Sequence, residues 1–167
     1  MTRQGLAANL GGNVQVWSYQ FTYNDLVATA GLTKTLDLYD TLSGPPYNTT
    51  TAQTFPQGSI VLYIRVKAST AFAGASVTSL KVRVGKSGGA SNFFTNDYEL
   101  TTAVADGNLQ ETFNTPMGQL SAVTPQVTFT AVGANMTALT AGVVNIDVCL
   151  VPITTPTSTP FSSTNVL

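Results

Sequence analysis

The sequence predicts an all-β protein: an antiparallel β-sandwich, jelly-roll-like, with an extended arm at each terminus. Short segments with an apolar residue at every second position recur along the chain, separated by Gly, Pro, Asn or Asp. Threonine, a β-branched residue that favours strands, accounts for 27 of the 167 residues. The pattern of an amphipathic helix does not occur, although residues 24–30 and 134–141 each suit a single helical turn.

The chain divides into two arms and one folded domain. Residues 1–13 are small, polar and Gly-rich, so we expect an extended N-terminal arm. Residues 14–151 carry the alternating segments and are expected to form the sandwich domain. Residues 152–167 are rich in Pro, Thr and Ser, which predicts a second extended arm. Because proline has no backbone N–H, this C-terminal arm cannot join the middle of a sheet.

The first part of the domain contains two expected strands and a long loop. The first strand follows Val14 and carries an aromatic stripe at every second position: Trp17, Tyr19, Phe21 and Tyr23. An aromatic strand face normally packs into a core, and a platform for stacking sugars is the alternative interpretation. The second strand places Leu36 and Leu38 on one face. Residues 43–50 combine Gly, Pro, Asn and Thr, which predicts the loop.

Residues 59–67 and 80–84 alternate most regularly. In the first segment, one face carries Ile60, Leu62, Ile64 and Val66, and the other carries Val61, Tyr63, Arg65 and Lys67. In the second segment, one face carries Leu80, Val82 and Val84, and the other carries Lys81 and Arg83. Residues 68–78 between them form a short segment of mostly small side chains. We therefore expect these two strands to pair directly with each other.

The remaining strands follow in the C-terminal half. Residues 93–102 are expected to be extended, and Asp-Gly-Asn at 106–108 predicts a turn. Residues 127–131 form a further strand, and residues 144–150 form the last one, which ends before Pro152. Cys149 lies in this last strand, where we expect it to act as a small buried apolar residue.

Charge and composition exclude several functions. Charged residues make up 9% of the chain and the net charge is −1. Because binding to nucleic acid requires many clustered Lys and Arg, we expect no nucleic-acid partner. The sequence contains no apolar run of about 20 residues, the length of a membrane span, so we expect no membrane partner. Histidine, whose ordinary pKa lies near neutrality, is absent, and we expect neither an enzyme nor a cofactor.

Three short patterns approach known sites without meeting their requirements. Gly-Lys-Ser at 85–87 looks like the end of a phosphate-binding loop, but Leu80 stands where that loop needs its first Gly. Asp97 and Glu99 share a strand face, where solvent-exposed acids are commoner than a catalytic pair. The turn at 106–108 supplies too few oxygen ligands for Ca²⁺. None of these patterns predicts a catalytic or metal site.

Two sets of residues are candidates for contact with a partner. The first is a positive ladder on the outward faces of the two strands expected to pair, suited to an acidic neighbouring subunit; the alternative is a solvated face that discourages aggregation. The ladder consists of Arg65, Lys67, Lys81 and Arg83. The second set lies in loops and the C-terminal arm, where exposing apolar side chains to water is costly. It consists of Tyr47, Phe93, Phe94, Pro160, Phe161, Val166 and Leu167.

The stretch from Phe55 to Phe94 carries FPQGSIVL at 55–62, TAFAGA at 70–75 and LKVRVG at 80–85. It resembles a pattern in virion proteins of tailed bacteriophages, in which a strand leads to a T-A-F-x-G loop and then to a strand ending V-x-V-G. The resemblance implies a capsid decoration or cement protein on the virion surface, made in the host cytoplasm. It further implies a β-sandwich body with arms that clasp the major capsid protein. No functional residues carry over, because the likeness concerns packing and turns.

A shell-binding protein of this kind is expected to be a homo-oligomer, either a dimer or a trimer. The alternative function is that of a tail or fibre component that binds a host-surface glycan through exposed aromatic residues.

Overall fold

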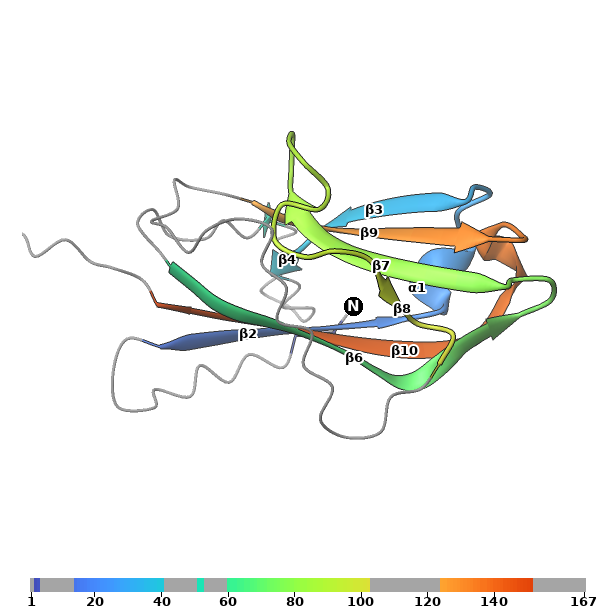
Figure 1. The fold of residues 1–167 in the computed structure, drawn as a ribbon, viewed down its shortest axis with the longest axis horizontal. Coiled ribbons are helices and arrows are strands. Elements are labelled where there is room, and N and C mark those ends of the chain that lie inside the picture. Colours follow the sequence, from blue (N-terminus) through green and yellow to red (C-terminus); the bar gives the residue numbers. More distant parts are fainter. Residues whose placement is uncertain (1, 4–13, 41–50, 53–59, 103–123, 152–167) are drawn as a thin grey trace, which may run out of the picture.

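Two four-stranded antiparallel sheets pack face to face in a computed structural model of the chain (Figure 1). The structure describes residues 2–3, 14–40, 51–52, 60–102 and 124–151. The predicted all-β sandwich is confirmed. No helix in the described part of the chain is long and apolar enough to span a membrane.

Strands from both halves of the sequence contribute to each of the two sheets. The order in the first sheet is β1 (Thr2–Arg3), β2 (Gln15–Thr22), β10 (Leu139–Val151) and β6 (Ile60–Gly74). The order in the second sheet is β3 (Thr33–Asp37), β9 (Pro125–Val132), β7 (Ser79–Lys86) and β8 (Tyr98–Glu99). A separate two-stranded ladder joins β4 (Tyr39–Asp40) to β5 (Thr51–Ala52).

The expected pairing between the strands at 59–67 and 80–84 is wrong, because the two lie in different sheets. β6 does not stop near Lys67 but continues to Gly74, along β10. Ala68 and Phe72 in this continuation are both buried, so the stretch packs as part of a strand rather than as a loop. A turn closed by the N–H of Val77 and the carbonyl of Gly74, 3.3 Å apart, then carries the chain across to β7 in the second sheet.

A bulge near the start of β6 changes which side chains face inward. Tyr63 lies opposite Cys149 and Val61 lies opposite Leu150, so Leu62 is an extra residue in β6. Val61 is therefore buried and Leu62 is 39% exposed, the reverse of the expected faces. Beyond the bulge, Ile64 is buried as predicted. The bulge reverses the alternation because an inserted residue shifts the strand by half a period.

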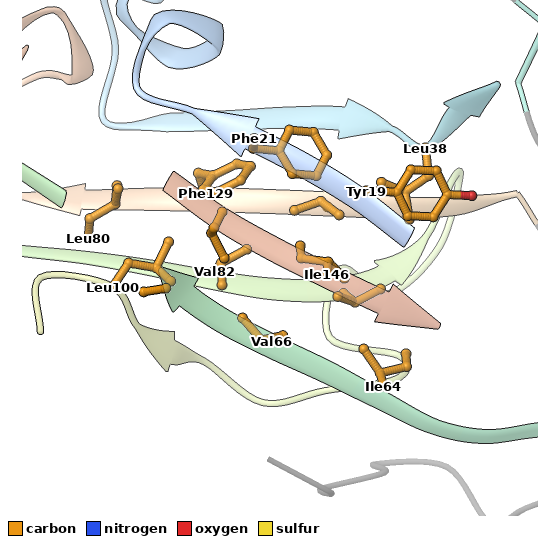
Figure 2. Close-up of a cluster of buried hydrophobic side chains, with 14 of the residues drawn as sticks. Tyr19, Phe21, Leu38, Ile64, Val66, Leu80, Val82, Leu100, Phe129 and Ile146 are labelled. Carbon is orange, nitrogen blue, oxygen red and sulfur yellow. The ribbon is translucent and has the colours of Figure 1, made fainter. Parts of the chain in front are cut away.

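The core lies between the sheets, and the aromatic stripe of β2 belongs to it as predicted. Trp17, Tyr19 and Phe21 are buried, whereas Tyr23 is half-buried just after the strand ends. The ring of Phe21 meets that of Phe129 edge to face, with centroids 5.5 Å apart (Figure 2). This pair joins the two sheets at the centre of the sandwich, so the stripe is no sugar platform.

Two short helical turns close one end of the sandwich. They are α1 (Asn24–Val27) and the 3₁₀ turn η1 (Met136–Ala138), within the two segments that the sequence predicted. Each buries one apolar side chain completely, Leu26 and Met136 respectively. The two turns therefore cover this end of the core. In Figure 1, α1 lies between the two sheets.

Candidate interaction surface

The four cations of the predicted ladder lie on two opposite faces of the molecule. Arg65 and Lys67 alternate with buried residues of β6, on the outer face of the first sheet. Lys81 and Arg83 alternate with buried residues of β7, on the outer face of the second sheet. The thickness of the sandwich separates the pairs. The single positive ladder is therefore wrong, because it depended on pairing between β6 and β7.

Acidic residues on the same faces pair with two of the four cations, one on each face. Arg65 Nε lies 3.0 Å from Asp147 Oδ2, across the β6–β10 pair. Arg83 Nε lies 3.3 Å from Asp97 Oδ1, as an ion pair that lacks hydrogen-bond alignment. Both pairs are partly exposed to solvent, so each contributes little to stability. Their main effect is that neither outer face presents a strong field to an acidic partner.

The outer face of the first sheet is a hydrogen-bonded polar surface. Gln20 Nε2 donates to Asn145 Oδ1 at 3.0 Å, which links β2 to β10. Asn145 Nδ2 donates to Ser69 Oγ at 3.4 Å, which extends the row to β6. The row links three neighbouring strands through uncharged side chains, and the charged Lys67 lies directly opposite Asn145 on the same face.

Threonine dominates the outer face of the second sheet. Thr35 and Thr128 lie opposite each other on β3 and β9, with their hydroxyl oxygens 3.2 Å apart. Two residue pairs further along, on the same face, Thr33 lies opposite Thr130. The abundance of Thr in the sequence therefore has a structural counterpart here: β-branched side chains that favour strands, although Thr128 is only 5% exposed and the hydroxyl of Thr130 is buried. This face and that of the first sheet are both polar and nearly neutral.

Glu99 lies at the end of β8, beside a residue whose hydrogen bonds link the second sheet to the first. Its carboxylate accepts hydrogen bonds from Ser79 Oγ at 2.5 Å, from the N–H of Leu80 at 3.1 Å and from Thr101 Oγ1 at 2.7 Å. The next residue, Leu100, donates its N–H to Leu80 at 2.7 Å and accepts from the N–H of Phe72 at 2.9 Å. Glu99 is thus a structural anchor rather than the solvated acid that we expected, while Asp97 remains partly exposed.

The hydrogen bonds also determine the acidity of Glu99. Burial by itself raises the pKa of its carboxyl, but the bonds from Ser79, Thr101 and the backbone of Leu80 lower it to about 2. The ordinary value is 4.5. Because the folded pKa is depressed, the ionised group stabilises the fold fully above pH 4.5, and this contribution is lost as the pH falls toward 2.

Replacing Glu99 by Gln is therefore expected to destabilise the protein in a pH-dependent way. At pH 7 the variant should lose about 1–2 kcal/mol, since the site is partly exposed and bonds to a charged acceptor become bonds to a neutral one. Urea unfolding at several pH values from 7 to 3 measures the difference, which should shrink below pH 4.5 as the carboxyl becomes protonated in the unfolded wild-type chain. Asp97→Asn is the control and should change stability by less than about 0.5 kcal/mol. If the difference in unfolding free energy between the wild type and Glu99→Gln stays constant down to pH 3, the low pKa of Glu99 is wrong.

Phe93 and Phe94 lie in the segment that follows β7. In Figure 1, the loop after β7 extends away from the second sheet. Phe94 is only 2% exposed and packs in the core of its own chain, so the expectation of partner contact is wrong for this residue. Its N–H donates to Val84 at 3.0 Å, which holds the ring inward. Phe93 is half-buried, edge-on to Phe94, with Lys86 Nζ 4.5 Å from its ring centroid. Phe93 therefore remains a candidate contact residue, whereas Phe94 does not.

Several predicted contact residues lie outside the described residues. They are Tyr47, Pro160, Phe161, Val166 and Leu167. The predicted turn at 106–108 also lies there. Cys149 is described and is buried as predicted, with 3% exposure. Burial raises the pKa of its thiol, which therefore stays protonated and unreactive near neutral pH.

Among the described residues, no group of His, Cys, Asp or Glu gathers closely enough to hold a metal ion. The large apolar side chains described as exposed are aliphatic: Leu32, Leu62 and Val132. A search of known protein families, curated proteins and solved structures finds nothing that matches the chain. The features that the sequence did not reveal are the anchoring role of Glu99 and the local neutralisation of the cations. Both depend on neighbours from other strands.

Proposed function

We propose that the protein is a structural component of a virion, a decoration or cement protein that binds the outer surface of a capsid shell. The proposal rests on the resemblance to virion proteins of tailed bacteriophages between Phe55 and Phe94. One structural observation carries it: several described residues of that pattern occupy tightly packed positions of the sandwich, as expected if the pattern encodes a shared framework.

The two glycines of the pattern illustrate this packing. A side chain on Gly74 would place its Cβ 2.3 Å from the carbonyl oxygen of Ala138, and one on Gly85 would meet that of Ala90 at 2.4 Å. Phe72, Val82 and Val84, from the same pattern, are buried in the core. The T-A-F-x-G segment is the end of a strand here rather than the expected loop, yet its Phe and Gly are still required for packing.

The strand connections favour the jelly-roll form of the sandwich. β2, β3, β6 and β7 enter the first and second sheets alternately, and β9 and β10 return to the middle of each sheet. Such interleaving brings the first and last long strands, β2 and β10, side by side. We include this connectivity in the proposal because jelly rolls are common in viral capsid domains.

In the proposed mechanism, the sandwich is a rigid body and its polar faces and arms make the contacts. The nearly neutral outer faces allow close packing among shell subunits, because few charges lose their hydration. The C-terminal arm, residues 152–167, would extend to the major capsid protein across subunit seams, whereas Thr2 and Arg3 of the N-terminal arm pair with β2 of the same chain. Closed symmetry of a dimer or trimer would let each particle-bound copy make the same contacts. Such contacts would help the shell to resist outward pressure, and they require no chemical reaction.

The copy number of the chain in purified particles tests the proposal. Quantitative mass spectrometry against the major shell protein should give many copies in a simple integer ratio to the shell subunit. A handful of copies per particle would overturn the decoration role and assign the chain to the tail, where glycan binding becomes the function to test. Absence from particles would overturn both.

Deleting residues 153–167 is expected to leave the domain folded and to weaken its retention on particles. The deletion removes no strand of either described sheet, so the thermal midpoint should stay unchanged. Retention is measured by sedimenting particles with the full-length or the shortened protein. A control variant carries a Gly/Ser segment of equal length in place of 153–167, to separate sequence from mere length. Equal retention of all the proteins would show that this arm makes no useful contact.

A further inference from the structure

Tyr63 lies on the outer face of the first sheet, beside a cysteine that faces outward and is nevertheless buried. In the sheet register, Tyr63 of β6 is directly opposite Cys149 of β10, and Val16 of β2 lies on the other side of Cys149. The alternation of β10 directs Cys149 to the same outer face as Asp147. Cys149 is only 3% exposed, so its thiol is covered on a face that is otherwise polar.

The ring of Tyr63 leans across β10 and contributes to this cover. Its hydroxyl donates a hydrogen bond to the sulfur of Cys149. Partial burial raises the pKa of the Tyr63 phenol, and the contact with the thiol raises it further. Because the tyrosine side chain is long and the cysteine opposite it is short, the hydroxyl meets the sulfur only if the ring lies along the sheet. One side of the half-buried ring therefore faces β10, and the other side faces outward.

Planar polar side chains follow Tyr63 along the same face. In the next row, Arg65 Nε lies 3.0 Å from Asp147 Oδ2. In the row after that, Gln20 Nε2 donates to Asn145 Oδ1 at 3.0 Å. Successive rows on one face of a sheet are about 7 Å apart. The face therefore offers an aromatic ring, then a guanidinium with a carboxylate, and then two amides, all within three rows.

These groups suit the chemistry of a sugar chain. A pyranose ring has an apolar side of C–H groups that packs on an aromatic ring, and its hydroxyls both donate and accept hydrogen bonds. The guanidinium of Arg65 donates, the carboxylate of Asp147 accepts, and an amide does both. The bonds within each row hold these side chains in place before a ligand arrives, which lowers the entropic cost of binding.

We propose that the outer face of the first sheet is a carbohydrate site, in which one ring of an oligosaccharide stacks on Tyr63. The following units would bond to the Arg65–Asp147 pair and then to the amides of Gln20 and Asn145. This site differs from the sugar platform considered for the aromatic stripe of β2, because that stripe is buried on the inner face of the same sheet. The inference does not depend on the virion function.

An NMR titration of the full chain tests the proposal. The probes are maltose, cellobiose and lactose, and the control is sorbitol, an acyclic polyol that has hydroxyls but no ring to stack. At least one disaccharide should shift the amides of Tyr63, Asp147 and Asn145 in a saturable way, with a dissociation constant in the millimolar range. Sorbitol at the same concentration should leave these amides unshifted.

Variants separate the ring from the polar rows. Tyr63→Ala should weaken binding about tenfold, because the stacking surface is lost. Arg65→Ala should weaken binding severalfold, through the loss of hydrogen bonds to the sugar. Arg83→Ala is the matched control, since Arg83 forms the corresponding ion pair on the outer face of the second sheet and should not affect binding. The amide spectrum of each variant shows whether the fold is intact.

Four outcomes overturn the proposal. The first is that none of the three disaccharides shifts the amides of this face. The second is that sorbitol shifts them equally, which indicates a solvent effect. The third is that Tyr63→Ala binds the disaccharide as tightly as the unmodified chain. The fourth is that the same amides shift with protein concentration in the absence of sugar, which would assign the face to contact between two copies of the chain.

Discussion

Replacing Phe129 by Ala is expected to lower the free energy of unfolding by about 3–5 kcal/mol, a large part of the stability of a typical domain. The side chain is completely buried, and its ring packs at 68° to that of Phe21. It lies on the inner face of β9, the strand between β3 and β7, and its contact with Phe21 joins the second sheet to the first. Truncation would leave a cavity that two rigid sheets cannot easily collapse to fill.

Urea unfolding followed by circular dichroism measures this change. Val132→Ala is the matched control in the same strand, because Val132 is 50% exposed and its truncation should cost less than about 0.5 kcal/mol. Phe129→Leu keeps most of the volume and should fall between the two. Similar losses for Phe129→Ala and Val132→Ala would show that the inter-sheet contact does not stabilise the sandwich as described.

Replacing Gly142 by Ala is expected to cost about 2–5 kcal/mol, from backbone strain and overpacking together. Gly142 lies at a register irregularity of β10 with φ 138°, a conformation that residues with side chains rarely adopt. An added Cβ would lie 2.3 Å from atoms of the Phe72 ring. The glycine lets the buried ring lie directly against the backbone, and any substitution displaces the ring or distorts the strand.

A double-mutant cycle separates the two causes. Phe72→Leu in the Gly142→Ala background should recover the overpacking part of the loss and leave the backbone strain. Gly31→Ala is the control, since a Cβ at Gly31 would have no neighbour closer than 3.8 Å. The free energy of unfolding of this variant should change by less than about 0.5 kcal/mol. Equal losses at Gly31 and Gly142 would contradict the packing explanation, and additive losses in the cycle would exclude the ring as the cause.

The strands and most of the core could be predicted because their signal is local to the chain. Alternation with period two placed Trp17 and Phe21 in β2, and Val127 and Phe129 in β9, on buried faces. The two helical turns were found for the same reason, as short breaks in the alternation. A residue's face within a regular strand depends only on its neighbours in sequence.

The candidate surface was predicted less well, because it depends on which strands become neighbours. Arg65 and Lys81 were correctly placed on outward faces, but alternation carries no information on the pairing partner, so their faces were wrongly joined. Phe94 follows a Gly/Ser-rich loop in sequence, and the hydrogen bonds of Phe94 and Thr95 to Val84 place its ring in the core. Glu99 had the pattern of an exposed acid, yet donors from β7 surround it.

By itself, then, the sequence of this protein determined the fold class, the strand positions and most inward-facing residues, since hydrophobic periodicity acts along the chain. Only the tertiary structure decided the partner of β6, the reversal of faces at Leu62 and the anchoring of Glu99. Each of these depends on a hydrogen bond or a register between residues far apart in sequence. The physical reason is that strand pairing is non-local: any of several alternating segments offers the same backbone groups, and close packing of the whole domain selects among them.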